Sequence, residues 1–294
     1  MSAADAIAPA LSWSVVAAVL FAALLHASWN ALIKAGDDQA LDTALIHVLG
    51  CGVGMALVVA VGLPRREALP WIAASLVIHV GYYVTLVGAY RHGELGFAYP
   101  LMRGTAPLIV ALLSGRLIGE HVPLAVWLGV VAISAGVVAI GFTRSQHDGG
   151  SRRRALAYAL ANAAIIATYT IVDGIGVRTS GNAAQYVALL FLVDGLPYFA
   201  IVLCQRRGAL APAFAYMRRR WPAALLGSCA SLGAYGIALW AMTRAPIASV
   251  AALRETSVLF ASLIGVVMLK ERFRLQRAVG TGAIIAGVMA LRLA

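Results

Sequence analysis

Long apolar runs alternate with short polar connections along the whole chain. Ten runs have about the 20 residues that a helix needs to cross a bilayer. They lie near residues 12–34, 42–62, 70–90, 97–118, 123–142, 154–177, 184–204, 221–243, 247–269 and 275–292. The pattern predicts an all-α polytopic membrane protein with ten transmembrane helices, and no connection is long enough to hold a soluble domain.

The second half of the chain repeats the first. Residues Arg103 to Ile140 align without a gap with Arg254 to Leu291, and roughly a third of the aligned positions are identical. Each half holds five spans, and an odd number means that the second copy enters the membrane from the opposite side. The sequence thus predicts two inverted five-helix repeats, residues 1–146 and 151–294, around a central cavity in one membrane domain.

The composition agrees with a membrane protein, since 62% of the 294 residues are hydrophobic and only 12% are charged. The net charge of +11 would suggest nucleic acid in a soluble chain, but here the cations fall between the apolar runs. Fifteen lysines and arginines lie in one set of loops and six in the other. Because cytoplasmic loops are enriched in these residues, we expect an inner-membrane protein with both termini outside, in the periplasm.

Polar and aromatic side chains share one face on six of the predicted helices. Polar groups are costly inside a bilayer, so such faces should point to the protein interior or to a wet cavity. We expect a substrate cavity lined by His26, Trp29, Asn30, His79, Tyr82, Tyr83, Tyr99, Arg103, Tyr158, Asn162, Tyr169, Tyr235 and Arg254. The alternative is that these groups bond to one another between packed helices. The runs 42–62, 123–142 and 275–292 are almost wholly apolar and should lie outside this ring.

Arg103 and Arg254 are equivalent positions in the two copies. Each lies about six residues, or roughly 9 Å, into its span, so the inversion places them on opposite sides of the midplane. A guanidinium grips a carboxylate with paired hydrogen bonds, which indicates carboxylate attraction at each entrance. The alternatives are a structural ion pair and snorkelling to the headgroups. Glu255 should not face Arg254, because adjacent helical residues diverge by about 100°.

Other ionisable groups lie inside or beside the spans. Asp173 and Asp194 are candidates for coupling to protons, although Asp194 precedes a glycine and a proline and is also suited to a helix break. Glu120 and Glu271 stand at helix ends in turn sequences, where we expect a boundary or capping role.

Several catalytic signatures are absent from the sequence. It contains no GxxxxGK[ST], HExxH, CxxC or GxSxG motif. The three cysteines, Cys51, Cys204 and Cys229, are far apart in or beside apolar runs and fit small apolar packing residues. We therefore expect no catalytic residues, no metal and no cofactor.

Two stretches resemble a known family. PLIVALLSGRLIGE (107–120) and SVLFASLIGVVMLKE (257–271) are each followed by a Gly-containing apolar helix. They are similar to the drug/metabolite transporter superfamily, in its ten-helix EamA-type branch, although Val258 stands where the first copy has Pro107. The resemblance implies a secondary transporter, most often an exporter of metabolites or amino acids. Aromatic amino-acid exporters of the YddG kind belong to this branch, and the tyrosine-rich faces fit that substrate class.

Two other functions stay open. One is a cationic drug exporter, like the four-helix members of the superfamily, which use a carboxylate in their first helix; here that helix has His26 and Asn30 and no acid. The other is a membrane enzyme acting on a lipid-linked substrate, for which no catalytic constellation is visible. We expect a small-molecule substrate and the lipid bilayer as partners, no nucleic acid, and a chain that acts as a monomer.

Overall fold

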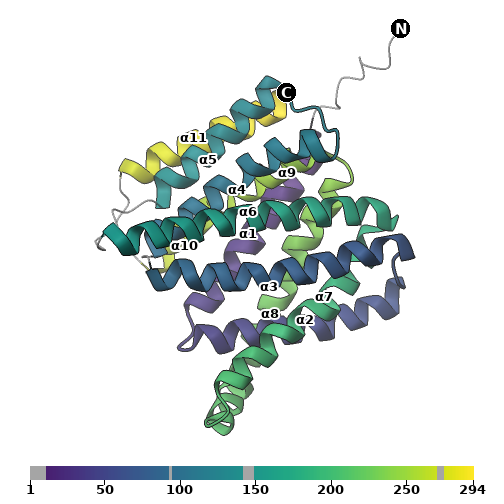
Figure 1. The fold of residues 1–294 in the computed structure, drawn as a ribbon, viewed down its shortest axis with the longest axis vertical. Helices are drawn as coiled ribbons and strands as arrows, with labels where there is room; N and C mark the ends of the chain where they lie inside the picture. Colours follow the sequence, from purple (N-terminus) through teal and green to yellow (C-terminus); the bar gives the residue numbers. More distant parts are fainter. Residues whose placement is uncertain (1–10, 93–94, 142–148, 270–274) are drawn as a thin grey trace.

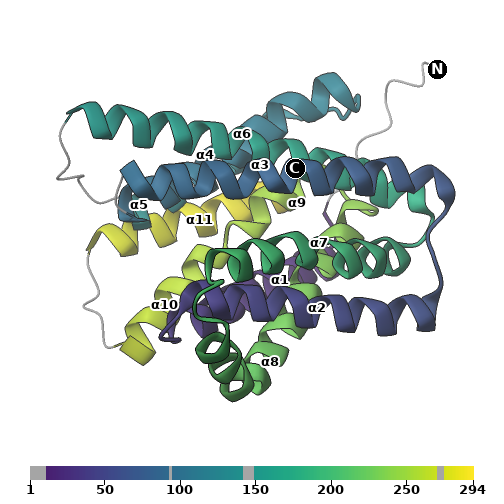
Figure 2. The same cartoon turned by 60° about the horizontal axis from the view of Figure 1, so that its bottom comes forward.

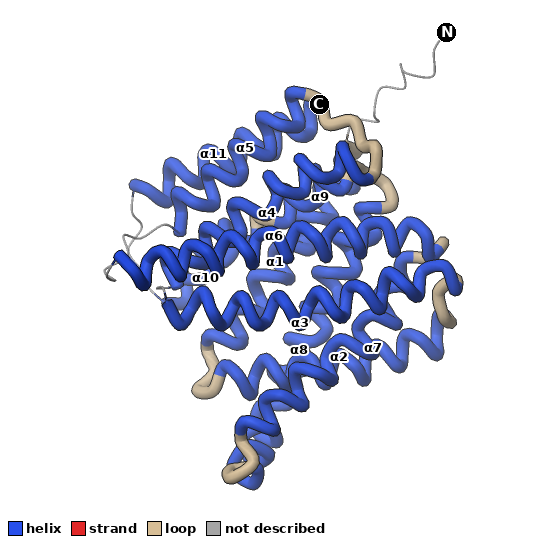
Figure 3. The backbone as a smooth tube through the Cα atoms, in the orientation of Figure 1, coloured by secondary structure: helices blue, strands red, loops and turns tan. Residues whose placement is uncertain are grey.

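The computed structural model describes residues 11–92, 95–141, 149–269 and 275–294, and these are helical almost throughout (Figures 1 and 3). The α-helices are α1 (Trp13–Lys34), α2 (Gln39–Val61), α3 (Leu69–His92), α4 (Leu95–Leu117), α5 (Leu124–Gly141), α6 (Gly149–Ser180), α7 (Ala183–Gln205), α8 (Leu210–Met242), α9 (Ile247–Arg254), α10 (Ser257–Leu269) and α11 (Leu275–Leu293), with a 3-10 helix η1 (Arg66–Ala68) before α3.

The helices have the lengths that a bilayer requires. Eight segments of the described residues are long and apolar enough to cross a membrane, one of them running from α9 into α10, and α5 and α11 provide two shorter apolar helices. The prediction of an all-α polytopic membrane protein is confirmed.

Local sequence sets several helix ends. The side chains of Ser12, Asp38 and Asn182 accept hydrogen bonds from the first free backbone N–H groups of α1, α2 and α7. After α2 and α6 the chain turns at Gly62 (φ 80°) and Gly181 (φ 75°), in the left-handed region that favours glycine.

Two helices differ from the predicted spans. α8 begins at Leu210 instead of residue 221, and its 33 residues reach about 50 Å, well beyond a bilayer core of about 30 Å. The stretch before residue 221 remains helical because Tyr216 and Arg220 both bond to Asp42. The predicted ninth span is broken, since residues 255–256 separate α9 from α10.

The helices of the two halves pack against each other in matched pairs. α1 packs on α8 and α3 on α6, whereas α2 packs on α7, α4 on α9, and α5 on α11. In the order of the chain, α1 and α3 of the first half correspond to α6 and α8 of the second. Exchanging the halves therefore converts the α1–α8 pair into the α3–α6 pair and leaves the other three pairs unchanged. A two-fold relation between the halves would produce these contacts, and the division at residues 146 and 151 stays a prediction.

The α5–α11 pair is joined by glycines. A Cβ added to Gly136 would lie 2.6 Å from the carbonyl oxygen of Gly280, and one added to Gly287 would lie 2.7 Å from that of Gly129. The absence of side chains lets the two backbones approach closely. The pair stands at one edge of the bundle (Figure 1).

Both described chain ends lie at the same end of the bundle. The guanidinium carbon of Arg292 is 5.0 Å from the ring centroid of Trp13, which joins the last turn of α11 to the first turn of α1. We call this the terminal end, and the end where α1 gives way to α2 the opposite end.

The opposite end is held by buried and half-buried ion pairs. Asp42 is only 2% exposed and accepts hydrogen bonds from Arg220 Nε at 3.0 Å and from the Tyr216 hydroxyl at 2.9 Å. Asp38 pairs with Arg206 at 2.6 Å. These contacts fasten the start of α2 to α8 and to the end of α7.

The terminal end is held by Glu120 and Arg178. Glu120 accepts the backbone N–H of Ile247 at 3.0 Å, at the start of α9, and pairs with Arg178 at 2.7 Å. Arg178 also donates to the carbonyls of Met242 and Ala245. Glu120 thus has the capping role expected at a helix boundary, whereas Glu271 lies outside the described residues.

Candidate functional site

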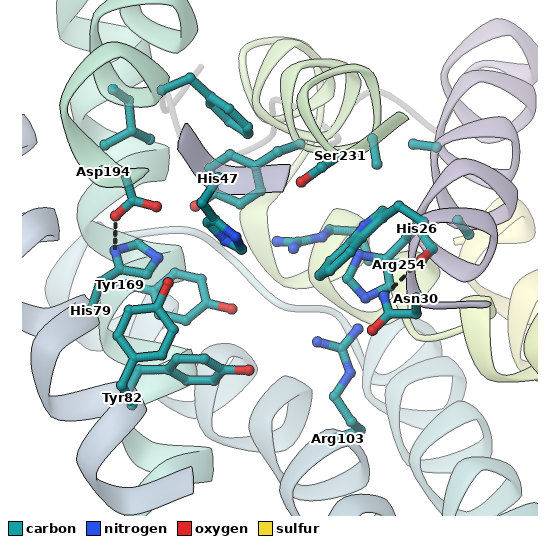
Figure 4. Close-up of a pocket in the computed structure, with 18 of the residues that line it drawn as sticks. His26, Asn30, His47, His79, Tyr82, Arg103, Tyr169, Asp194, Ser231 and Arg254 are labelled. Atoms are coloured by element: carbon teal, nitrogen blue, oxygen red, sulfur yellow. Dashed lines mark hydrogen bonds and ion pairs between the residues drawn. The ribbon is translucent and has the colours of Figure 1, made fainter. Parts of the chain in front are cut away.

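A cavity of about 170 Å³ lies in the middle of the bundle (Figure 4). Its walls come from α1, α2, α3, α4, α6, α7, α8 and α9, and Figure 2 shows α2, α7 and α8 apart from α4 and α6. The volume is roughly that of five or six waters, so the cavity suits a small ligand. We call it the central pocket. Its polar and aromatic lining residues are His26, Trp29, Asn30, His47, His79, Tyr82, Tyr83, Tyr99, Arg103, Tyr169, Phe191, Asp194, Ser231, Tyr235 and Arg254.

Arg254 closes the last turn of α9 and faces the central pocket. It is the eighth residue from the terminal end of that helix, about 10 Å deep and so well inside a bilayer core of about 30 Å. Its guanidinium carbon is 5.1 Å from the ring centroid of Tyr235, a cation–π contact. No carboxylate among the described residues forms an ion pair with it, so its charge is available to a ligand.

Arg103 lines the same pocket from α4, so the two arginines do not mark two separate entrances. Its Nε lies 2.8 Å from Oε2 of Glu255, and both side chains are largely buried. The two atoms form an ion pair although they are off hydrogen-bond geometry. The structure therefore realises, for Arg103, the alternative of a structural ion pair. Glu255 pairs across the bundle and not with its neighbour Arg254, as the helical geometry predicts.

Glu255 owes its position to the break between α9 and α10. The N–H groups of Val258 and Leu259 bond to the carbonyls three residues earlier, at Glu255 and Thr256, instead of continuing the four-residue pattern. Broken helices at membrane depth are common at transporter binding sites, where they line a cavity. Here the break brings a carboxylate and a guanidinium beside the pocket on consecutive residues.

The opposite wall of the central pocket carries the acidic group Asp194. It comes from α7 and lies 4.0 Å from Nδ1 of His79. That nitrogen is 2.8 Å from the backbone carbonyl of Ser75, so it donates its proton there. Figure 4 shows Asp194 and His79 on one side of the pocket, and Arg103 and His26 on the other. The pocket is therefore polarised, with an acid on one wall and cations on the other.

Aromatic rings fill the space between these walls. The ring of His79 stacks on Tyr169 with centroids 4.7 Å apart, and Tyr82 meets Tyr169 edge to face at 6.3 Å. Tyr83 stacks on Tyr198 at 4.9 Å. On α1, Trp29 packs edge to face against His26, and its indole Nε1 is buried without a hydrogen-bond partner. Flat ring surfaces are thus offered to a ligand.

Two predicted cavity or coupling residues lie behind the pocket instead of in it. Asn162 is fully buried and donates to the Tyr82 carbonyl at 3.0 Å and to the Thr85 hydroxyl at 2.9 Å. Asp173 is also fully buried and accepts from Tyr186 at 2.8 Å and from Tyr235. Both follow the alternative interpretation, in which polar groups bond between packed helices.

Tyr158 also lies outside the central pocket. Its ring is 37% exposed and stacks on His92 at 5.7 Å, near the opposite end of the bundle. It shares a helical face with Tyr169, but the early part of α6 packs against Gly88 of α3, where the pocket does not reach. A shared helical face shows which way a side chain points but not how far along the membrane normal it lies. For this reason the sequence placed Tyr158 in the pocket, whereas the structure places it outside.

The sequence missed the contribution of α2 and, apart from Asp194, that of α7. His47 reaches the pocket from α2, which was expected to lie outside the ring, and contacts Trp29 and Tyr198 edge-on or tilted. Leu190 and Phe191 line the pocket from α7. A single histidine in an apolar run is the signal that could have indicated α2; two apolar residues in an apolar run offered none.

Comparisons with known proteins agree with this architecture. The model of the EamA-like transporter family matches residues 153–293. A solved crystal structure of a protein has 20% sequence identity with this chain and a TM-score of 0.73, and the match covers 96% of this chain and 98% of the other. At that identity the likeness shows the fold alone. A search of curated proteins found no match.

The family match covers the half of the chain that contributes Tyr169, Asp194, Tyr235 and Arg254 to the central pocket. It supports a membrane transporter of small substrates and not an enzyme. Residues 153–293 thus match the EamA-like transporter family, within a polytopic membrane protein.

Proposed function

We propose that the protein is a secondary transporter of a small zwitterion, an amino acid, with aromatic side chains favoured. One observation carries the proposal. Arg254, which has no carboxylate partner among the described residues, faces an aromatic pocket whose opposite wall holds Asp194. A ligand with a carboxylate and an ammonium group separated by an organic body would complement both walls.

The carboxylate end of such a ligand would meet Arg254 and Trp29. A guanidinium forms paired hydrogen bonds with a carboxylate, and the Trp29 ring lines the pocket beside it. Arg103 is committed through Nε to Glu255 and adds positive potential rather than a free fork. Hydrogen bonds to charged groups contribute about 1.5–3 kcal/mol each, enough to discriminate an acid from its amide.

The ammonium and side-chain ends would meet Asp194 and the tyrosines. Asp194 is 22% exposed along its side chain, open enough to receive a ligand cation. Tyr82, Tyr83 and Tyr169 present ring faces and edges on which an apolar or aromatic side chain can stack. This arrangement favours amino acids over purely anionic metabolites.

Transport would proceed by alternating access. The pocket lies between the contacts that hold the terminal end, through Glu120 and Arg178, and those that hold the opposite end, through Asp42 and Arg220. Loosening one set while the other stays closed would expose the ligand to one side at a time. The cation-rich opposite end would face the cytoplasm, with both termini in the periplasm and the substrate moving outward.

The two other candidate functions fit the pocket less well. A cationic drug would find Asp194 but would be repelled by Arg103 and Arg254. Chemistry on a lipid-linked substrate would need a nucleophile or base beside a reacting atom, and the pocket is built of stacked rings and ion pairs.

Competition in proteoliposomes tests the proposal. Uptake of radiolabelled phenylalanine would be measured against an excess of unlabelled phenylalanine, phenylalanine amide, phenethylamine or 3-phenylpropanoate. We expect the zwitterion to compete best, because it alone satisfies both walls. Equal competition by phenethylamine would instead favour the cationic drug exporter, and a chemically altered label would identify an enzyme.

A further inference from the structure

A second cavity lies between α1, α10 and α11, and none of its lining residues belongs to the central pocket. Its volume is about 530 Å³, within the range of about 300–1,000 Å³ that holds small organic ligands. The lining is apolar apart from three hydroxyl groups. It consists of Trp13, Val16, Leu20, Thr256, Leu259, Phe260, Ser262, Leu263, Thr281, Ile284, Ile285, Val288 and Met289. We call this cavity the lateral groove.

The lateral groove opens toward the lipid side of the bundle. Trp13, Leu263 and Ile285 line it and are 60%, 60% and 55% exposed. On each helix the lining residues follow a single stripe with steps of three and four residues, so three helix faces enclose one elongated space. From Thr281 to Met289 the stripe on α11 extends about 12 Å along the helix. A surface of this kind would be covered by hydrocarbon in a bilayer.

A cation stands at one end of the lateral groove. Arg292 lies four residues beyond Val288, on the same face of α11, and its guanidinium carbon is 5.0 Å from the ring centroid of Trp13. Its Nε is buried without a hydrogen-bond partner, and no carboxylate of the described residues pairs with it. Tryptophan and arginine at helix ends lie at the depth of the lipid headgroups. The groove therefore runs from an unpaired cation at headgroup depth into the apolar layer.

We propose that the lateral groove binds one anionic phospholipid, with an acyl chain between α1, α10 and α11 and the phosphate on Arg292. The phosphate would bind the guanidinium of Arg292, because a guanidinium binds phosphate oxygens in pairs. Because hydrocarbon surrounds the protein on all sides, the acyl chain alone gains little by leaving the bulk lipid. Selectivity must come from the headgroup. Both classes of lipid carry a phosphate, but the ammonium group of a zwitterionic headgroup is repelled by the Arg292 guanidinium, so the site prefers an anionic phospholipid.

Native mass spectrometry of the delipidated full chain tests this site. The protein in detergent micelles would be titrated with dipalmitoyl phosphatidylglycerol, and in parallel with dipalmitoyl phosphatidylcholine, dodecanol and inorganic phosphate. We expect one phosphatidylglycerol to bind about tenfold more tightly than phosphatidylcholine, since the choline cation beside the phosphate opposes the charge of Arg292. Equal binding of inorganic phosphate would overturn the acyl-chain part of the proposal, and equal binding of dodecanol would overturn the headgroup part.

Matched variants locate the site. Arg292→Gln should lower the affinity for phosphatidylglycerol about tenfold. Arg244→Gln is the matched control, because the Arg244 guanidinium carbon also lies over a tryptophan ring, 4.7 Å from the centroid of Trp240, and it should leave the affinity unchanged. Leu263→Trp fills the groove from α10 and should also weaken binding. Val279→Trp, at a 62% exposed position of α11 outside the groove, should leave it unchanged.

A photoreactive acyl chain separates this site from the general lipid shell. Cross-links of a diazirine-bearing phosphatidylglycerol should concentrate on α10 and α11 and be lost in Arg292→Gln. Undiminished cross-linking in that variant, or full affinity in it, would overturn the proposal. Because the readout is lipid binding, it is independent of whether the central pocket carries amino acids.

Discussion

Arg103 and Glu255 form an ion pair of 2.8 Å between α4 and the break that separates α9 from α10. The contact joins the first half of the chain to the second beside the central pocket. Each partner is nearly surrounded by protein, with 10% and 6% of the side chain exposed. Neither charge is stable at that depth without the other, so the pair holds the broken helix against α4.

Glu255→Gln should therefore destabilise the protein through Arg103. Removing one partner of a buried ion pair leaves the other charge uncompensated and typically costs about 3–5 kcal/mol. The double variant Arg103→Gln/Glu255→Gln should recover part of that loss. Thermal unfolding in detergent, measured as a double-mutant cycle, checks the coupling.

The control for this cycle is the pair Arg254 and Glu255. They are adjacent in sequence but form no ion pair among the described residues, so their coupling energy should be smaller than that of Arg103 and Glu255. Strong coupling of Glu255 to Arg254 and not to Arg103 would contradict the observed pairing.

Arg254→Lys should impair the transport of a carboxylate substrate more than that of its amide. Lysine keeps the charge but loses the planar fork that grips both carboxylate oxygens. Loss of one charged hydrogen bond, at about 1.5–3 kcal/mol, corresponds to a roughly 10- to 100-fold lower affinity. Half-saturation constants for phenylalanine and its amide in proteoliposomes provide the measurement. Equal losses for both ligands would assign Arg254 a structural role through Tyr235.

The number of spans could be predicted because the apolar runs and the polar connections between them are local properties of the sequence. The break at residues 255–256 could not, because no proline or glycine marks it. What stabilises the break is the pairing of Glu255 with Arg103, a contact between residues far apart in the chain. An intramembrane acid needs a partner, but nothing in the sequence identifies that partner as Arg103.

The faces of single helices predicted much of the pocket lining, because a helical face is also a local property of the sequence. They failed where the depth of a residue depends on tertiary packing. Tyr169, Asn162, Asp173 and Tyr158 share one face of α6, yet only Tyr169 lines the pocket. The face is a direction common to all four, whereas the neighbours that cover Asn162 and Asp173 belong to α3, α7 and α8. Those neighbours are set by tertiary packing, which the periodicity of one helix does not contain.

Gly280→Ala should destabilise the contact between α5 and α11. The added Cβ would lie 2.7 Å from the Gly136 carbonyl and 2.5 Å from the side chain of Ile140, so the helices must separate. Overpacking of this kind costs about 1–3 kcal/mol. Gly282→Ala is the matched control on the same helix, because nothing lies within 4 Å of its added Cβ.

The control should be neutral or stabilising, since alanine is a better helix former than glycine by up to about 1 kcal/mol. Thermal unfolding of both variants in the same detergent provides the comparison. If the two variants unfold at the same temperature, the close approach of α5 and α11 is not a determinant of stability.

Variants of Asp173 and Asp194 should show that the first acid stabilises the fold and the second binds the ligand. Asp173→Asn changes a fully buried carboxylate that accepts from Tyr186 and Tyr235. An amide offers only one acceptor oxygen, so one tyrosine O–H loses its acceptor, and the expected loss of stability is about 1–3 kcal/mol. Asp194→Asn changes a partly exposed group at the pocket wall. Asp194→Asn should leave the unfolding temperature nearly unchanged. It should weaken the binding of phenylalanine, which has an ammonium group, about tenfold more than the binding of 3-phenylpropanoate, which has none.

Measurement of both quantities on both variants decides the assignment. Thermal unfolding should show a loss of stability in Asp173→Asn, and competition in proteoliposomes should show a loss of affinity in Asp194→Asn. The reason is that Asp173 is buried behind the pocket, whereas Asp194 lines it. A selective loss of ammonium recognition in Asp173→Asn, with Asp194→Asn unaffected, would move the ligand's cation site from α7 to α6. The zwitterion orientation proposed for the central pocket would then be wrong, since Asp173 accepts from Tyr235, whose ring lies against the guanidinium of Arg254.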